Sequence, residues 1–194
     1  MSNIAMDYPN GKFIEIINGI AIKMAPARTG HQYAVANIWR ILDRYLWGGP
    51  CHMFHEVYVH LTEDNRFVPD LVVVCDKEKI KDSGIFGAPD LILEVLSHST
   101  RKNDRGYKMD VYGKAGVKEY WIVDIAAYSI EIYMPQNGHM KLDAAYSIYP
   151  KWEIDEMTDE EKTERLIYNF KTSLFEDLTI NLQEIFTHIL PEDY

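Results

Sequence analysis

Two acidic residues stand inside segments that otherwise have the composition of buried strands. Glu94 interrupts the apolar run LILEVLS (91–97), and Asp70 interrupts the run FVPDLVVVC (67–75). An isolated ionised carboxylate in such a place costs on the order of several kcal/mol, so each acid must be protonated, paired or bound to a cation. If the two strands are neighbours, the acids meet at one edge of a sheet and form a site for a hard cation.

A lysine follows these acids on the next predicted helix. Asp104, Lys108 and Tyr112 are spaced four residues apart and therefore share one helix face. In one interpretation Lys108 leans over the two acids. In the other it forms an ordinary exposed ion pair with Asp104 beside a packed tyrosine. For the acids themselves, the alternative is that a buried Arg or Lys pairs with one of them and serves only the fold. The coincidence of two buried acids with a nearby lysine favours a functional site.

The remaining motifs argue against several other chemistries. The segment CHMFHEVYVH (51–60) is rich in histidine, but on an extended strand His52 and His60 would lie roughly 26 Å apart and could not share one ion. The sequence has no glycine-rich phosphate loop, no G-x-S-x-G elbow and no closely spaced cysteine pair. Nucleotide binding, serine hydrolysis and zinc binding are therefore not expected.

The hydrophobic pattern predicts the elements that must position the acids. Apolar residues at helical spacing predict helices over 31–46, 103–115 and 182–190, and Asn18-Gly19 predicts a tight turn inside a hairpin over 13–24. Strands are expected near 53–61, 67–75, 90–97 and 119–124, followed by a second hairpin over 128–148. This order predicts an α+β fold in which helices flank a mixed central sheet.

Composition sets limits on the domain organisation and on the partners. A chain of 194 residues suits a single domain over 1–194, and its net charge of −10 argues against non-specific nucleic-acid binding by the whole surface. Residues 101–118 nevertheless contain six basic residues and only two acidic ones, which allows a local basic patch. Without an apolar leader or membrane span, a cytoplasmic protein is expected. Cys51 and Cys75 are not expected to form a disulfide framework.

The run PDLVVVC, GAPDLILEVLSHST and DRGYKMDVYGKAGVKEYWIVD resembles the Uma-two family of restriction endonucleases, which belongs to the PD-(D/E)XK nuclease-like superfamily. The resemblance extends from EIING (15–19) to the final NLQEIF, and its most specific part is 69–124. It identifies Pro69-Asp70 as the PD element and Glu94 as the second acid. The superfamily's usual lysine position is Leu96 here, and the family supplies its lysine from the following helix, which matches Lys108.

The resemblance implies a restriction-endonuclease-like fold and metal-dependent hydrolysis of DNA phosphodiester bonds. Asp70, Glu94 and the carbonyl of Val95 would hold Mg²⁺ or Mn²⁺, and Lys108 would orient the attacking water or neutralise developing charge. Further residues are assigned to the site as accessory groups (Glu15, His31 and Asp104) and as contacts to the phosphate backbone (Arg101, Lys102 and Arg105).

Two further expectations concern assembly and an alternative role. The superfamily resemblance suggests a homodimer, because two symmetric sites can cut both strands of a duplex. A nuclease-like fold can also serve as a non-catalytic DNA-binding or regulatory module, since fold does not determine function. The complete set of Asp70, Glu94 and Lys108 favours the enzyme.

Overall fold

The structure is a computed structural model that describes residues 14–189. The first residue of the predicted hairpin, Phe13, and the last residue of the predicted final helix, Leu190, lie outside the described residues, as do both ends of the domain predicted over 1–194.

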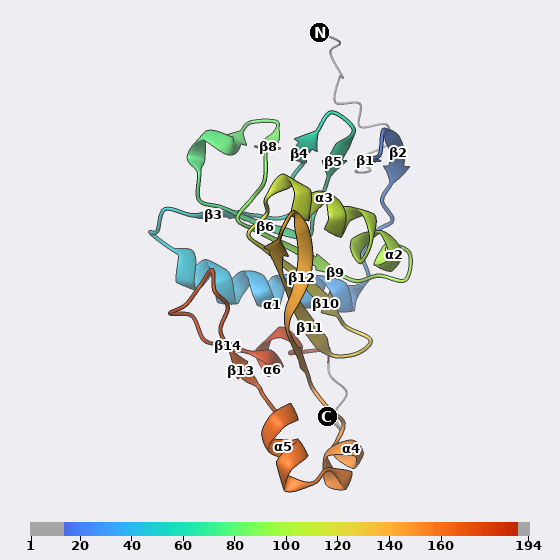
Figure 1. The fold of residues 1–194 in the computed structure, drawn as a ribbon, viewed down its shortest axis with the longest axis vertical. Helices are drawn as coiled ribbons and strands as arrows, with labels where there is room; N and C mark the ends of the chain where they lie inside the picture. The colour runs from blue at the N-terminus through green and yellow to red at the C-terminus, as the bar shows by residue number, and fades with distance from the viewer. Residues whose placement is uncertain (1–13, 190–194) are drawn as a thin grey trace.

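A six-stranded mixed sheet forms the centre of the molecule, with the strand order β12-β11-β10-β9-β6-β3 (Figure 1). The pair β9–β10 is parallel and the other neighbours are antiparallel. The strands are β3 (His52–Phe54), β6 (Leu71–Val74), β9 (Leu91–Val95), β10 (Glu119–Asp124), β11 (Ser129–Gln136) and β12 (His139–Ser147). The predicted α+β class and mixed central sheet are confirmed.

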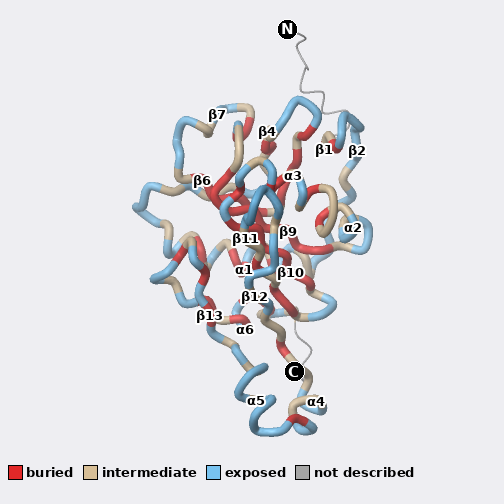
Figure 2. The backbone as a smooth tube through the Cα atoms, in the orientation of Figure 1, coloured by how far each residue is buried: buried red, intermediate tan, exposed pale blue. Residues whose placement is uncertain are grey.

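Both faces of this sheet are covered. On one face, Leu93 packs in the same core as Ile38 of α1 (Thr29–Leu46). On the other, Ile92 packs with Tyr112 of α3 (Tyr107–Ala115). Figure 2 shows buried residues concentrated in the strands between these two helices. Because side chains alternate along a strand, Glu94 lies on the same face as Ile92 and points toward α3.

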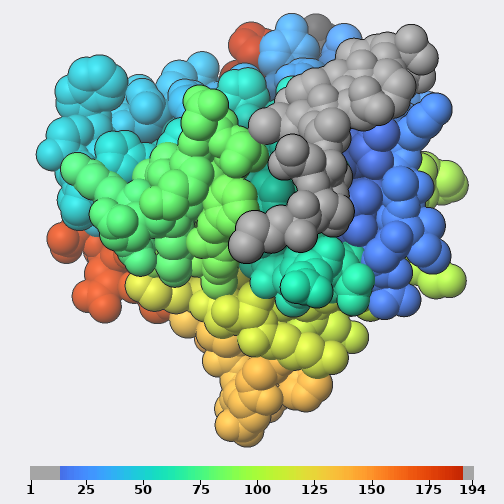
Figure 3. Space-filling view, turned by 90° about the horizontal axis from the view of Figure 1, so that it is seen from above, coloured from blue at the N-terminus to red at the C-terminus, as the bar shows by residue number. Residues whose placement is uncertain are grey.

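A second six-stranded sheet has the order β2-β1-β5-β4-β8-β7, and its residues Val59, Phe67 and Ile85 share the core that contains Ile92 and Tyr112. Figure 3 shows its three hairpins side by side at one end of the molecule, β1–β2 in blue, β4–β5 in teal and β7–β8 in green. The predicted turn is present, since Asn18 and Gly19 have φ of 52° and 75°. The strands are β1 (Ile14–Ile17), β2 (Ile20–Lys23), β4 (Val59–Thr62), β5 (Asn65–Phe67), β7 (Ile80–Lys81) and β8 (Gly84–Phe86).

Several shorter elements complete the fold, and two of them, β14 (Ile180–Asn181) and α6 (Leu182–Ile185), contribute Ile180, Leu182 and Ile185 to the core. The acidic segment after β12 folds into two short helices at the opposite end of the molecule from the second sheet (Figure 1), and Thr158 caps the second of them. The other shorter elements, including these two helices, are η1 (Lys77–Lys79), α2 (Arg101–Asp104), α4 (Lys151–Glu156), α5 (Asp159–Arg165) and β13 (Asn169–Phe170). The side chain of Asn181 caps α6 as predicted, but that helix is much shorter than 182–190.

Two predicted strands were wrong, because each divides between the two sheets. The segment 53–61 contributes β3 to the central sheet and β4 to the second one, with a break at Glu56, where φ is 49°. The segment 67–75 contains the end of β5 and then β6. The break falls at Pro69, which has no N–H to donate to a strand ladder. Asp70 therefore lies at the junction between the sheets and not inside a strand.

The predicted helix 103–115 also divides, into α2 and α3, at Arg105 and Gly106. It ends as expected at Gly116, whose φ of 89° is the left-handed conformation typical of a helix C-terminus. The helix over 31–46, the strands near 90–97 and 119–124, and the hairpin over 128–148 are confirmed.

A disulfide between Cys51 and Cys75 corrects the expectation that these cysteines form no disulfide framework. His52 and Val74 are partners in the antiparallel pair β3–β6, and continuing this register by one residue places the cysteines opposite each other. Their Cα atoms are 3.9 Å apart. Concerning membranes, none of the helices within residues 14–189 has the length and apolar character of a membrane span.

Candidate active site

Asp70 directly precedes β6, and Glu94 lies near the end of the neighbouring strand β9. In the antiparallel pair β6–β9, Leu71 is the partner of Leu93. Continuing this register by one residue places Asp70 opposite Glu94, where Cβ atoms are typically about 4.5–5.5 Å apart. The Asp70 carboxylate accepts a hydrogen bond from the N–H of Val95 at 2.7 Å, so it reaches across to the strand that carries Glu94.

The other oxygen of Asp70 is paired with His31, from the first turn of α1. Their Nε2–Oδ1 distance is 2.9 Å, and each side chain is 13% exposed. Burial lowers the pKa of His31, but the hydrogen bond and the negative charge of Asp70 outweigh it, and the pKa is raised above its ordinary value. His31 thus orients Asp70 from the α1 side of the sheet.

Lys108 lies at the centre of three carboxylates on the opposite side. Its ammonium is 2.8 Å from Glu15, 3.0 Å from Glu94 and 3.4 Å from Asp104, which come from β1, β9 and α2. The Lys108 side chain is only 2% exposed. The interpretation of Lys108 as part of an exposed ion pair is therefore wrong, because the lysine is buried and reaches Glu94 in the central sheet.

The electrostatics of this cluster follow from its burial. Burial lowers the pKa of Lys108, but the three carboxylates raise it by more than burial lowers it. The pKa is therefore above its ordinary value, and the amine stays charged. Burial raises the pKa of Glu94 well above its usual range, and Lys108 only partly opposes this. The pKa of Asp104 is raised by burial in the same way. The cluster has more acids than bases, and a bound cation would compensate the excess.

Tyr112 is a member of the cluster whose contact the sequence reasoning missed. Its hydroxyl donates a hydrogen bond to Glu94 Oε1 at 3.0 Å, and its side chain is fully buried. The spacing of four residues between Lys108 and Tyr112 could have indicated this contact, because both side chains project from the same face of α3 toward Glu94 in β9.

The oxygen atoms at the end of β9 suit a hard cation. Residues 14–189 contain no group of three or more His, Cys, Asp or Glu side chains arranged to hold a metal ion. The donors would therefore be Asp70, Glu94 and the carbonyl of Val95, completed by water. Such a set would be compatible with Mg²⁺, which commonly keeps several waters and binds one or two carboxylates.

The arginines predicted to contact substrate are paired within the protein. Arg101 lies 3.0 Å from Asp124 at the end of β10, and Arg105 contacts both Asp124 and Glu131. Lys102 is exposed and lies beside Arg101 on the short helix α2. The structure thus places the three residues beside the end of the central sheet but does not join them to the Lys108 cluster.

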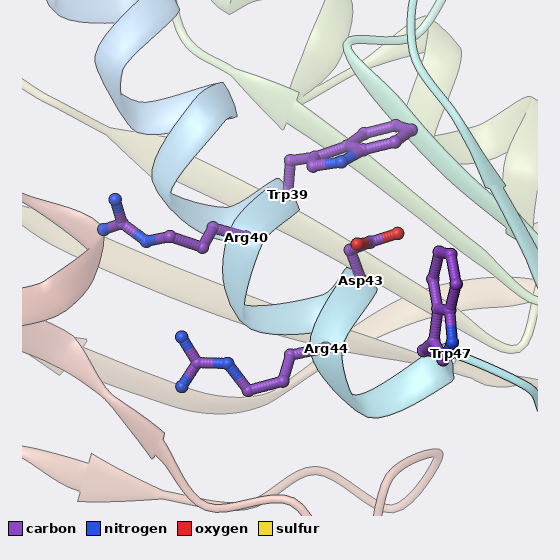
Figure 4. A pocket seen from close by; sticks show the side chains of 5 residues that line it. All are labelled: Trp39, Arg40, Asp43, Arg44 and Trp47. Atoms are coloured by element: carbon purple, nitrogen blue, oxygen red, sulfur yellow. The ribbon is translucent and has the colours of Figure 1, made fainter.

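A hollow on the outer surface of α1 is separate from this cluster. Its lining comes from the C-terminal half of the helix (Figure 4). His31, in contrast, lies in the first turn of α1. Figure 4 shows two indoles and a carboxylate on one side of the helix and two guanidinium groups on the other. The lining residues are Trp39, Arg40, Asp43, Arg44 and Trp47.

The fold is shared with a known structure. A protein from Anabaena variabilis, described as "a putative nuclease belonging to DUF820", superposes with a TM-score of 0.68 over 91% of both chains, at 17% sequence identity. This similarity establishes a nuclease-like α+β fold for the chain.

The sequence places the chain in a family. Residues 4–158 match the model of Uma2, described as "Putative restriction endonuclease", and the chain belongs to this family, which confirms the resemblance. A curated relative, the uncharacterized protein slr1290 of Synechocystis, is 25% identical over 122 residues. That match covers 61% of this chain and 64% of the relative, so the chain spans just under two thirds of the relative's length.

Proposed function

We propose that this protein is a metal-dependent endonuclease that hydrolyses DNA phosphodiester bonds. The observation that carries the proposal is the buried ammonium of Lys108 at 3.0 Å from Glu94, together with the hydrogen bond from the N–H of the next residue, Val95, to Asp70. Membership of a family described as restriction endonucleases and the nuclease-like fold both support it.

The oxygens of Asp70, Glu94 and Val95 would hold Mg²⁺ or Mn²⁺. When bound, such an ion polarises a phosphoryl oxygen and lowers the pKa of a coordinated water. Hydrolysis adds a water molecule across one P–O bond, with a proton lost by the water and a proton gained by the leaving oxygen. The protein's own part is to hold the ligands in place and to supply positive charge near the phosphate.

Lys108 and His31 act on the two acids from opposite sides of the sheet. Lys108 favours the ionised form of Glu94, whose pKa burial would otherwise raise further. The charge of Lys108 also favours the negative charge that develops on the phosphate during attack. His31 fixes the orientation of Asp70 through its 2.9 Å contact.

DNA is the proposed substrate, and the basic residues near α2 are its proposed contacts. Arg101, Lys102 and Arg105 would bind the phosphate backbone, and the arginines would then exchange their carboxylate partners for phosphates. A homodimer is proposed as well, because two symmetric sites allow cleavage of both strands. Light scattering that shows a monomer at working concentration would refute the dimer.

A cleavage assay tests the enzymatic proposal. Plasmid and oligonucleotide DNA are incubated with the protein in Mg²⁺, in Mn²⁺ and in EDTA, and we expect cleavage only with a metal. Glu94→Gln should abolish it. Glu119→Gln is the matched control, because Glu119 is also buried but accepts its hydrogen bonds away from the cluster, from Trp121, Ser173 and Leu174. Metal-independent cleavage, or an active Glu94→Gln variant, would contradict the proposal.

A non-catalytic DNA-binding or regulatory module is the second candidate. It is favoured by the enclosure of the cluster, since Glu94 is only 4% exposed and Asp104 only 1%. This role predicts DNA binding that needs no metal, without cleavage under any of the three conditions. The same assay, combined with a gel-shift measurement, therefore separates the two functions.

A further inference from the structure

The Glu94 carboxylate is held asymmetrically. Its Oε1 atom accepts hydrogen bonds from Lys108 Nζ and from the Tyr112 hydroxyl, each at 3.0 Å. Within residues 14–189, no hydrogen-bond donor contacts the second oxygen, Oε2. One oxygen is thus occupied by protein donors, and the other is left for a ligand outside the protein.

Lys108 by itself does not fix this orientation. Its ammonium has three hydrogens, and it lies near three carboxylates, those of Glu15, Glu94 and Asp104. An ammonium is also a compact charge without a preferred plane. The second donor on the same oxygen comes from Tyr112, and two donors restrict the rotation of a carboxylate more than one.

The Tyr112 ring is fully buried between two other aromatic rings. It packs edge-on against Phe67, with 5.5 Å between centroids, and at a tilt of 57° against Tyr120, with 5.0 Å between centroids. The helix that carries it is seated closely on the β11–β12 turn, because a Cβ atom at Gly113 would lie 2.9 Å from the backbone nitrogen of Met140. The hydroxyl therefore has a defined position relative to β9.

We propose that Tyr112 is a positioning residue that holds Glu94 Oε1 and so directs Oε2 toward the cation site shared with Asp70. The role rests on the proposed function, since it assigns Tyr112 to the metal site of the nuclease. It acts through Glu94 and makes no contact with substrate. Outer partners of metal ligands commonly change metal affinity or activity by about 10- to 100-fold when they are removed.

Tyr112→Phe tests this role, because it removes the hydroxyl and keeps the packed ring. The matched control is Tyr120→Phe, which removes an equally buried hydroxyl that donates to the backbone carbonyl of Asp104 at 3.0 Å. Mn²⁺ affinity without DNA, the Mg²⁺ midpoint for cleavage and the urea midpoint are measured for both. We expect Tyr112→Phe to weaken Mn²⁺ binding and raise the Mg²⁺ midpoint by about tenfold. Tyr120→Phe should shift only the urea midpoint.

A second pair of variants shows whether the effect passes through Glu94. In a Glu94→Gln background, Tyr112→Phe should cause no further loss of Mn²⁺ affinity. Equal metal midpoints for Tyr112→Phe and Tyr120→Phe, while the wild type binds Mn²⁺, would overturn the role of Tyr112 and leave the nuclease proposal standing. A wild type that neither binds Mn²⁺ nor cleaves DNA would refute the proposed function and this role with it.

Discussion

Replacing Lys108 by methionine should destabilise the fold substantially. The substitution keeps a long unbranched side chain but removes the charge shared by Glu15, Glu94 and Asp104, all at most 4% exposed. Removing one partner of a buried ion pair costs about 3–5 kcal/mol. Glu94 and Asp104 have raised pKa values and can take up protons to relieve part of this cost. We therefore expect a loss of about 3 kcal/mol, at the lower end of that range.

Urea unfolding at neutral pH, followed by circular dichroism and by tryptophan fluorescence, measures this loss. A decrease of about 3 kcal/mol is a large part of the about 5–15 kcal/mol that stabilises a typical domain. Lys114→Met is the control, because Lys114 is exposed on the same helix. It should change the free energy of unfolding by less than about 0.5 kcal/mol.

A double variant tests whether uncompensated charge is the cause. Adding Glu94→Gln to Lys108→Met removes one of the carboxylates that lost its partner, so part of the stability should return, about 1 kcal/mol or more. The reasoning is refuted if Lys108→Met costs less than about 1 kcal/mol, which is the scale of an exposed pair. It is also refuted if the double variant is less stable than Lys108→Met.

Three further predictions concern other parts of the molecule. Replacing Cys51 and Cys75 by serine should lower the free energy of unfolding by about 3.5 kcal/mol in the loop-entropy model, given their separation of 24 residues; equal urea midpoints with and without reductant would contradict this. Glu131→Gln should release Arg105, strengthen DNA binding several-fold at low salt and steepen the salt dependence of binding by about one phosphate contact. If fluorescence anisotropy shows the same salt dependence for the variant and the wild type, Arg105 does not exchange Glu131 for a DNA phosphate. Burial and the Glu131 hydrogen bond raise the pKa of Tyr133 from 10.0 to about 12. Its contribution to stability should be complete below pH 10 and disappear as the pH rises through 12, and urea unfolding of Tyr133→Phe across this range should lack that loss.

Local features of the sequence determined most of the secondary structure. The apolar spacing in 31–46 specifies α1, and the short, mainly apolar runs LILEV and EYWIVD specify β9 and β10. Turns and ends follow from single residues, since Asn137-Gly138 forms the second hairpin turn and Gly116 ends α3. Turns and helix ends can be predicted from the sequence because they depend on hydrogen bonds between residues close in the chain. They also depend on the backbone conformations that glycine and asparagine can adopt.

Contacts between distant segments were decided only by the tertiary structure. The division of 53–61 between two sheets depends on which neighbour each half finds, because a strand pattern does not identify its partner. The pairing of Cys51 with Cys75 depends in the same way on the register of β3 against β6. The basic character of 101–118 predicted free phosphate contacts, but the position of α2 beside the end of β10 neutralises Arg101 and Arg105.

The candidate site shows both contributions at once. The sequence alone determined that Glu94 needs a partner, because a carboxylate in an apolar strand cannot remain ionised and isolated. Lys108 was predicted from the sequence as one partner, but packing decided the other contacts: Tyr112 also reaches Glu94 from α3, and Glu15 contacts Lys108 from another sheet. Residues far apart in sequence come into contact only when the strand registers of both sheets and the packing of α3 against them are fixed. No single segment of the sequence specifies these registers or this packing.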